Sequence, residues 1–338
     1  MLCGHYPAIG PDMITPADMK FHTPEDPNDH LWSETNYFSF HIPAAKLNGN
    51  IYSLFRPTLG VMTSFIHVWA GDSENHQGVL YTDGRTHLPI PKDQDLDDYT
   101  LANGLRVQVL PDNGGNRDYR IDYQGYNNSE LHLHFRGLME PYDIHDPDMD
   151  PLANSGVATW SDAYKNGHFD MTAHVTGECR LHGVSHPVDC VSTMDHSWGA
   201  RAECNINNMS WFHSSWGEDR TIHCIFMLDP HALGDAYGQF MHGYVMENGE
   251  VFGIKSASGK AQRNGLMQET MDVTVTDVRG QTFHMTGRSI ARNQWNAWPG
   301  LCVYHALMEW TLDGAIGYGE CQDLISLAYI TSGGIVAP

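Results

Sequence analysis

The sequence predicts an all-β protein of antiparallel sheets that close, or nearly close, into barrels. Apolar and polar residues alternate with a period of two along many short segments, whereas the spacing of amphipathic helices is scarce. Turn dipeptides separate these segments: Asp83-Gly84, His182-Gly183, Asn248-Gly249, Arg279-Gly280 and Asp313-Gly314. The Asn-Gly and Asp-Gly pairs suit type I′ hairpins, because both central residues of that turn need a positive φ. With so many strands, barrel closure avoids long exposed edges.

Four segments carry the alternation most clearly. At 130–136, apolar residues at 131, 133 and 135 alternate with charged residues and histidines, and the segments 169–176 and 222–228 repeat the pattern. The segment 211–216 is rich in aromatic residues, and strand geometry puts alternate residues on opposite faces. One face would carry Trp211, His213 and Ser215, and the other face would carry Phe212, Ser214 and Trp216.

A chain of 338 residues suits two domains better than one small core. The best candidate boundary is the stretch 140–167, which is rich in proline and aspartate and shows little alternation. We therefore expect an N-terminal β domain at residues 1–155 and a C-terminal β domain at residues 156–338.

The charge of the chain limits its partners. Forty-one acidic residues against nineteen basic ones give a formal net charge of -22, which disfavours binding to nucleic acid or to an anionic membrane surface. No apolar run approaches the roughly eighteen residues of a membrane-spanning helix, and the first residues do not resemble a signal peptide. Seven cysteines without C-x-x-C spacing fit a reducing compartment. We expect a cytoplasmic protein, with a homodimer left open.

The segment Met194–Arg201 concentrates groups that carry chemistry: an acid, an imidazole, a hydroxyl, an indole and a guanidinium. Asp195 and His196 are neighbours, so a regular strand points them to opposite faces, and they share a site only where the strand bends. Apolar surroundings raise the pKa of a carboxyl, which suits a general acid. The alternative is an ion pair between Asp195 and Arg201 with Trp198 packed beneath it.

A metal centre is a weaker prediction. His132 and His134 would face the same way on one strand and present two ligands, but a third ligand has to come from elsewhere. The alternative is a solvated sheet face. The sequence lacks the G-x-G-x-x-G, Walker A, G-x-S-x-G and H-E-x-x-H motifs. We therefore expect neither a nucleotide cofactor nor a resident metal.

The segment Gly177–Arg201, with its Asp-His-Ser-Trp-Gly run, resembles the G-x-x-D-x-S-W-G-x-R signature of a bacterial family of AttH-like proteins and carotenoid 1,2-hydratases. Ser53–Gly60, Gly243–Gly249 and Leu312–Glu320 are similar to other recurrent stretches of that family. The resemblance implies two consecutive lipocalin-like antiparallel β-barrels, with a ligand pocket in or between them. It also implies that Asp195 matches the aspartate that is thought to protonate a double bond in the hydratases.

We expect an enzyme: a cofactor-free lyase or isomerase, of hydratase or dehydratase type, acting on a hydrophobic cyclic, terpenoid, steroid or aromatic small molecule. Asp195 is the expected general acid, with His196 or His213 as base or orienting group. The expected substrate-binding residues are Trp198, Arg201, Trp211 and Trp216. One alternative is a non-catalytic carrier of a hydrophobic ligand, and another is a metal-dependent enzyme that uses His132 and His134.

Overall fold

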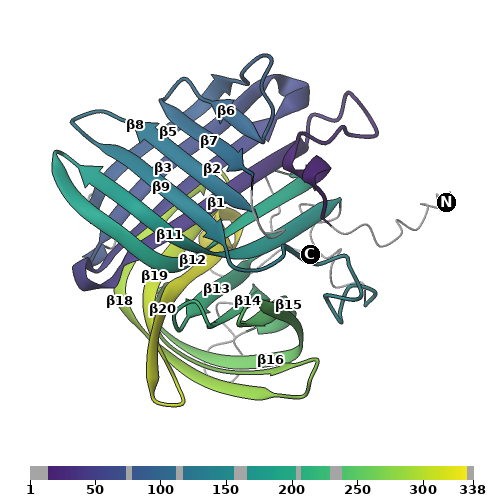
Figure 1. Cartoon of the computed structure of the whole chain (residues 1–338), viewed down its shortest axis with the longest axis vertical. Helices are drawn as coiled ribbons and strands as arrows, with labels where there is room; N and C mark the ends of the chain where they lie inside the picture. Colours follow the sequence, from purple (N-terminus) through teal and green to yellow (C-terminus); the bar gives the residue numbers. More distant parts are fainter. Residues whose placement is uncertain are drawn as a thin grey trace.

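The structure is a computed structural model that describes residues 14–73, 78–111, 117–155, 166–202, 207–228 and 238–332. Two antiparallel β structures make up the described chain. In Figure 1 the purple-to-teal strands form a broad curved sheet, and the green-to-yellow strands form a barrel beside it. The predicted all-β, lipocalin-like architecture is confirmed, with the first barrel open and the second closed.

The curved sheet is a half-barrel with the strand order β5-β3-β2-β1-β12-β11-β9-β8-β7-β6, and β10 pairs with β11. Within the described residues its end strands, β5 and β6, do not pair with each other. Its strands are β1 (Trp32–Ile42), β2 (Leu47–Arg56), β3 (Val61–Ala70), β5 (Val79–Pro89), β6 (Asp98–Thr100), β7 (Leu105–Leu110), β8 (Asp118–Gln124), β9 (Glu130–Gly137), β10 (Tyr142–Asp143), β11 (Gly167–Leu181) and β12 (Val184–Ala200).

The second structure is an eight-stranded barrel, closed by the pairing of β13 with β20 and of β17 with β18. Its strands are β13 (Met209–Ser215), β14 (Arg220–Leu228), β15 (Gly238–Glu247), β16 (Glu250–Asn264), β17 (Met267–Asp277), β18 (Thr282–Trp298), β19 (Leu301–Leu312) and β20 (Ala315–Ser326). The two-residue strand β4 (Asp72–Ser73) adds to β18 in parallel.

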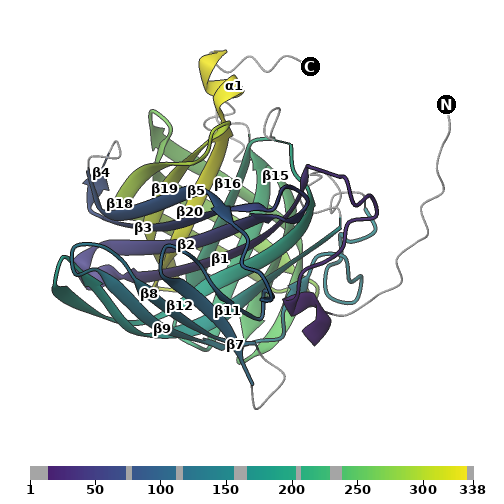
Figure 2. The ribbon, with the colours of Figure 1, turned by 90° about the horizontal axis from the view of Figure 1, so that it is seen from above.

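Helices are few and short. Three 3₁₀ turns, η1 (Pro16–Met19), η2 (Pro43–Ala45) and η3 (Pro57–Leu59), precede β1, β2 and β3. A single turn of α-helix, α1 (Leu327–Thr331), follows β20 at one end of the molecule (Figure 2). None of the described helices has the length and apolar character needed to cross a membrane.

The chain leaves the half-barrel for the barrel between Ala200 and Met209. The predicted boundary at 155/156 falls instead between β10 and β11, which pair with each other in the half-barrel. The physical reason is that the irregular stretch after residue 140 connects two strands of one sheet, and its composition marks a long connection rather than a change of sheet. Residues 156–165 lie outside the described part of the chain.

The predicted hairpins are confirmed at three turns, where both central residues have a positive φ. These turns are His182-Gly183, Asn248-Gly249 and Asp313-Gly314. Arg279-Gly280 also lies in a turn, between β17 and β18. The prediction at Asp83-Gly84 is wrong, because this pair lies inside β5. Glycine is needed there for packing, since a Cβ on Gly84 would lie 2.5 Å from the ring of Phe65.

Glu320 on β20 ties the barrel to the half-barrel. Its Oε2 accepts a hydrogen bond from the Tyr37 hydroxyl at 2.9 Å, and the Asn50 amide donates to its Oε1 at 2.9 Å. From the barrel, His305 Nδ1 and Gln322 Nε2 approach Oε1 at 2.7 and 3.0 Å. Burial raises the pKa of this carboxyl, but the donors outweigh burial and lower the pKa of Glu320 overall. Glu320 is therefore a buried, fully bonded anion.

We predict that Glu320→Gln lowers the free energy of unfolding by about 3 kcal/mol, because an amide group then faces donors that need an acceptor. Glu309→Gln is the matched control, since Glu309 pairs with exposed Arg288 at 2.6 Å and such pairs contribute roughly 0–1 kcal/mol. Urea unfolding of both variants measures the difference. Equal losses would show that Glu320 does not hold the interface together.

Candidate active site

A small cavity lies between the half-barrel and the barrel. Within the described residues its volume is about 20 Å³, which is room for one water molecule. Two strands of each structure supply its walls: His168, Asp170, Thr193 and Asp195 come from β11 and β12, and Trp211, His223 and Ile225 come from β13 and β14.

The register of two hairpins explains this gathering. Asp170 on β11 lies opposite Asp195 on β12, and His213 on β13 lies opposite His223 on β14. Side chains alternate between the two faces of β11. Phe169 therefore packs into the apolar core of the half-barrel, and its neighbours His168 and Asp170 point to the other face. Such a polar face usually meets solvent, but here the barrel covers it and buries it.

Asp195 is poised to carry a proton. Burial raises the pKa of Asp195 to about 6, although the nearby charge of His168 acts in the opposite direction. The side chain keeps partial exposure and lines the cavity. A carboxyl of this kind holds its proton to much higher pH than an ordinary aspartic acid, and it can deliver the proton into the cavity.

Asp170 lies between two imidazoles. Its Oδ2 is 3.0 Å from His168 Nε2 and 3.4 Å from His223 Nε2. Burial opposes ionisation of Asp170, but His223 and His168 outweigh burial and hold its pKa well below the usual value. Burial lowers the pKa of His168, and the negative charge of Asp170 raises it overall. The cavity thus has an anionic group, Asp170, beside the Asp195 carboxyl.

His213 lies one layer behind the cavity. Its Nε2 is 2.9 Å from the Thr172 hydroxyl, which is also 2.8 Å from the Tyr244 hydroxyl. The ring of His213 lies 6.3 Å from that of His223, measured between centroids. Burial lowers the pKa of His213 well below its usual value, so this imidazole is neutral. His213 does not line the cavity.

Among the predicted site residues, Asp195 and Trp211 line the cavity, and His196 does not. Strand β12 stays regular, so His196 points to the opposite face, where its Nδ1 lies 3.0 Å from the Thr35 carbonyl oxygen. Burial there lowers the pKa of His196 to about 3. The expected pairing of His196 with Asp195 is therefore corrected by strand geometry.

The three remaining predicted residues also lie away from the cavity wall. Trp198 is on the His196 face of β12, stacked on His22 with 3.9 Å between ring centroids. Trp216 packs against the barrel core and donates its indole N–H to the Ala315 carbonyl at 3.3 Å. Arg201 donates to the hydroxyls of Ser197 and Thr35, so the alternative of an ion pair with Asp195 is not realised.

Three residues of the cavity wall, His168, Asp170 and His223, are absent from the predicted site. No such spacing marks His223 on β14, whereas His168 and Asp170 have an H-x-D spacing on β11, which resembles the H-x-H spacing of His132 and His134 on β9. Those two histidines are exposed, with His132 Nδ1 2.7 Å from Asp122 and His134 Nε2 3.6 Å from Asp118. They belong to no group of three metal-ligand side chains among the described residues, so the metal hypothesis at these positions gains no support.

The chain matches one family model and is similar in fold to solved structures. A family model described as "Domain of unknown function (DUF7064)" matches residues 15–324. No curated protein sequence matches. A crystal structure assigned as AttH from Nitrosomonas europaea has a TM-score of 0.62 and 11% identity, over 95% of this chain and 98% of that chain. Kievitone hydratase from Nectria haematococca has a TM-score of 0.55 and 9% identity, over 94% of each chain. At these identities the likeness establishes the fold.

We predict that Asp170→Asn costs about 3–5 kcal/mol of unfolding free energy at neutral pH, because it removes the anion between two buried imidazoles. The pKa of Asp170 is lowered, so its contribution is present above the ordinary value of 3.8 and disappears as the pH falls through the folded-state pKa. The difference between wild type and variant should therefore shrink in acid.

The control for this variant is Asp189→Asn, on the same hairpin. Asp189 pairs with His174 at 2.7 Å but is 80% exposed, so its loss should cost no more than about 1 kcal/mol. Denaturant unfolding from pH 3 to pH 7 compares the two. A loss for Asp170→Asn that stays constant over this range would contradict the assigned charges.

Proposed function

The chain belongs to the family of this domain of unknown function, and we propose that it adds or removes water on a hydrophobic small molecule, with Asp195 as the general acid. One observation carries the proposal. A carboxyl whose pKa is raised to about 6 lines a water-sized cavity, next to the indole of Trp211. A proton donor, a water site and an aromatic wall are three of the elements that hydration of an alkene uses.

In the hydration direction, the Asp195 carboxyl gives its proton to one carbon of a double bond. The π electron pair forms the new C–H bond, and a cation develops at the other carbon while Asp195 becomes a carboxylate. Water in the cavity then attacks the cation and gives its proton to a base. Dehydration runs through the same steps in reverse.

His223 is the best candidate for the base. Asp170 accepts only when ionised, so it favours the tautomer of His223 with the proton on Nε2, at 3.4 Å. This tautomer leaves Nδ1 with a lone pair. Neither ring nitrogen of His223 makes a hydrogen bond among the described residues, and its contact with Asp170 is an ion pair by distance. Asp170 would then stabilise the imidazolium that forms, in the manner of an acid–histidine pair.

The walls favour a hydrophobic substrate. Trp211 packs edge-on against Tyr37, with 5.6 Å between centroids, and Ile225 completes an apolar side of the cavity. Aromatic faces stabilise a cation by roughly 0.5–2 kcal/mol. The shared fold with kievitone hydratase is consistent with this class of chemistry.

The barrel interior weighs against a simple carrier. Its described part is packed with core side chains, Phe212, Phe226 and Trp310 among them. Barrels that carry a ligand inside leave their lumen open for it, so the described interior does not support transport of a ligand within the barrel.

The first test is Asp195→Asn, which keeps the size of the side chain and removes the transferable proton. We expect a rate loss of roughly 10²–10⁴-fold with little change in melting temperature, because Asp195 has no ion-pair partner to lose. The assay incubates a panel of cyclic terpenoid, steroid and phenolic alkenes in D₂O. Mass spectrometry then detects products that gain water together with one carbon-bound deuterium.

Two tryptophan variants serve as matched controls. Trp211→Phe changes the wall of the cavity and should raise KM, whereas Trp216→Phe alters a ring packed against the barrel core and should leave the kinetics unchanged. An Asp195→Asn protein that is destabilised but fully active per folded molecule would end the catalytic assignment.

A further inference from the structure

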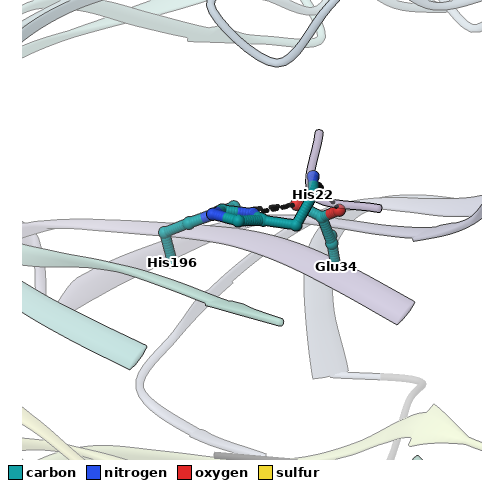
Figure 3. A group of neighbouring side chains, drawn as sticks. All are labelled: His22, Glu34 and His196. Atoms are coloured by element: carbon teal, nitrogen blue, oxygen red, sulfur yellow. Dashed lines mark hydrogen bonds and ion pairs between the residues drawn. The ribbon is translucent and has the colours of Figure 1, made fainter. Parts of the chain in front are cut away.

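A second polar cluster lies on the face of β12 that points away from the cavity. Figure 3 shows His22, Glu34 and His196 pointing toward one another, from the segment before β1, from β1 and from β12. Glu34 Oε2 is 3.1 Å from His22 Nδ1 and 3.8 Å from His196 Nε2. One ligand atom from each residue lies within 4.8 Å of the other two.

In each imidazole, the ring nitrogen that points away from Glu34 already has a partner. His196 Nδ1 is 3.0 Å from the Thr35 carbonyl oxygen, which can only accept, so Nδ1 carries the proton. His22 Nε2 is 3.2 Å from the Asp18 carboxylate. Histidines that ligate metals are typically held in this way, with one nitrogen donating to a carbonyl or carboxylate and the other facing the metal.

The other ring nitrogen of His196, Nε2, points toward Glu34 and makes no hydrogen bond among the described residues. With its proton on Nδ1, Nε2 presents a lone pair, and it makes no hydrogen bond although the side chain is only 3% exposed. The atom facing it is a carboxylate oxygen of Glu34, which is fully buried. A lone pair that faces a buried carboxylate without a donor between them is unfavourable, and a cation between them would satisfy both.

We propose that His22, Glu34 and His196 bind one divalent transition-metal cation. Two imidazoles and one carboxylate match the ligand preference of zinc, with a water completing the coordination. The expectation of no resident metal rested on missing motifs, but these ligands are separated by 12 and 162 positions, and no short motif spans such distances. His22 is 21% exposed, which gives the ion a route from solvent.

The metal would act as a clamp. It would join the segment before β1 to β1 and β12, where Trp198 already stacks on His22. Because the site is on the opposite face of β12 from Asp195, it would take no part in proton transfer in the cavity. Metal binding to the folded state alone stabilises that state, so the clamp should raise the melting temperature.

The test uses the full chain, stripped of metal with a chelator and then titrated with Co²⁺, whose visible spectrum reports coordination. We expect one equivalent with the absorption of a four- or five-coordinate ion, displacement by Zn²⁺ and a higher melting temperature. Asp18→Asn should weaken binding by about 10–100-fold, the usual effect of an outer partner. His22→Ala, at a partly exposed position that should leave the fold intact, should weaken binding further, as should Glu34→Gln.

The control is the double variant His132→Ala, His134→Ala, which removes the exposed H-x-H pair of β9 and should leave the bound equivalent intact. Two results would overturn the proposal. One is a chain that binds no saturable equivalent of Co²⁺ or Zn²⁺. The other is a signal that survives His22→Ala and Glu34→Gln but disappears in the control, because the metal would then be held by surface histidines.

Discussion

Polar groups buried between the half-barrel and the barrel must find their partners across that interface, because unbonded polar atoms in an apolar layer are costly. Glu320 makes this constraint concrete, since Tyr37 and Asn50 from one side and His305 from the other all meet its carboxylate. The bonds fix how the two β structures sit against each other. The placement of the β11–β12 hairpin over β13 and β14, and with it the cavity, depends on that arrangement.

Three carboxyl groups between the half-barrel and the barrel show how the surroundings of a carboxyl decide its charge. Glu320 is surrounded by donors and Asp170 by two imidazoles, so the pKa of each is lowered despite burial. Asp195 keeps partial exposure at the cavity, yet no donor bonds to it among the described residues, and burial raises its pKa to about 6. The two satisfied anions hold the structure, and the unsatisfied carboxyl is left to exchange a proton.

The sequence predicts much of this fold because alternation and turn chemistry are local. The strand patterns at 130–136 and 222–228 and the turns at His182-Gly183, Asn248-Gly249 and Asp313-Gly314 are found as expected. The site is less predictable, because similar sequence patterns lie in different surroundings. His134 on β9 faces solvent, whereas Asp170 on β11 faces the barrel, and only the packing of the two β structures distinguishes them.

The other differences between the predicted and the observed site also arise because local sequence does not encode how distant strands pack together. Asp195 could be identified because several reactive groups crowd one segment, but its partners His168 and His223 come from separate strands. The sequence brings His196 to the same site as Asp195 only if the strand bends between them, and β12 runs through both residues without a bend. The change of sheet after Ala200 leaves no compositional signal, while the proline-rich connection before β11 leaves a strong one.

The central claim is that burial raises the pKa of Asp195 to about 6, well above the ordinary value for an aspartic acid. Carbon-13 NMR of protein labelled at the aspartate carboxyl carbons measures this directly, with the Asp195 resonance assigned by its absence from Asp195→Asn. We predict a titration midpoint near pH 6, while the Asp170 resonance stays that of a carboxylate down to low pH. A midpoint for Asp195 near the ordinary value of 3.8 would contradict the account, because the cavity would then contain a carboxylate with no proton to give.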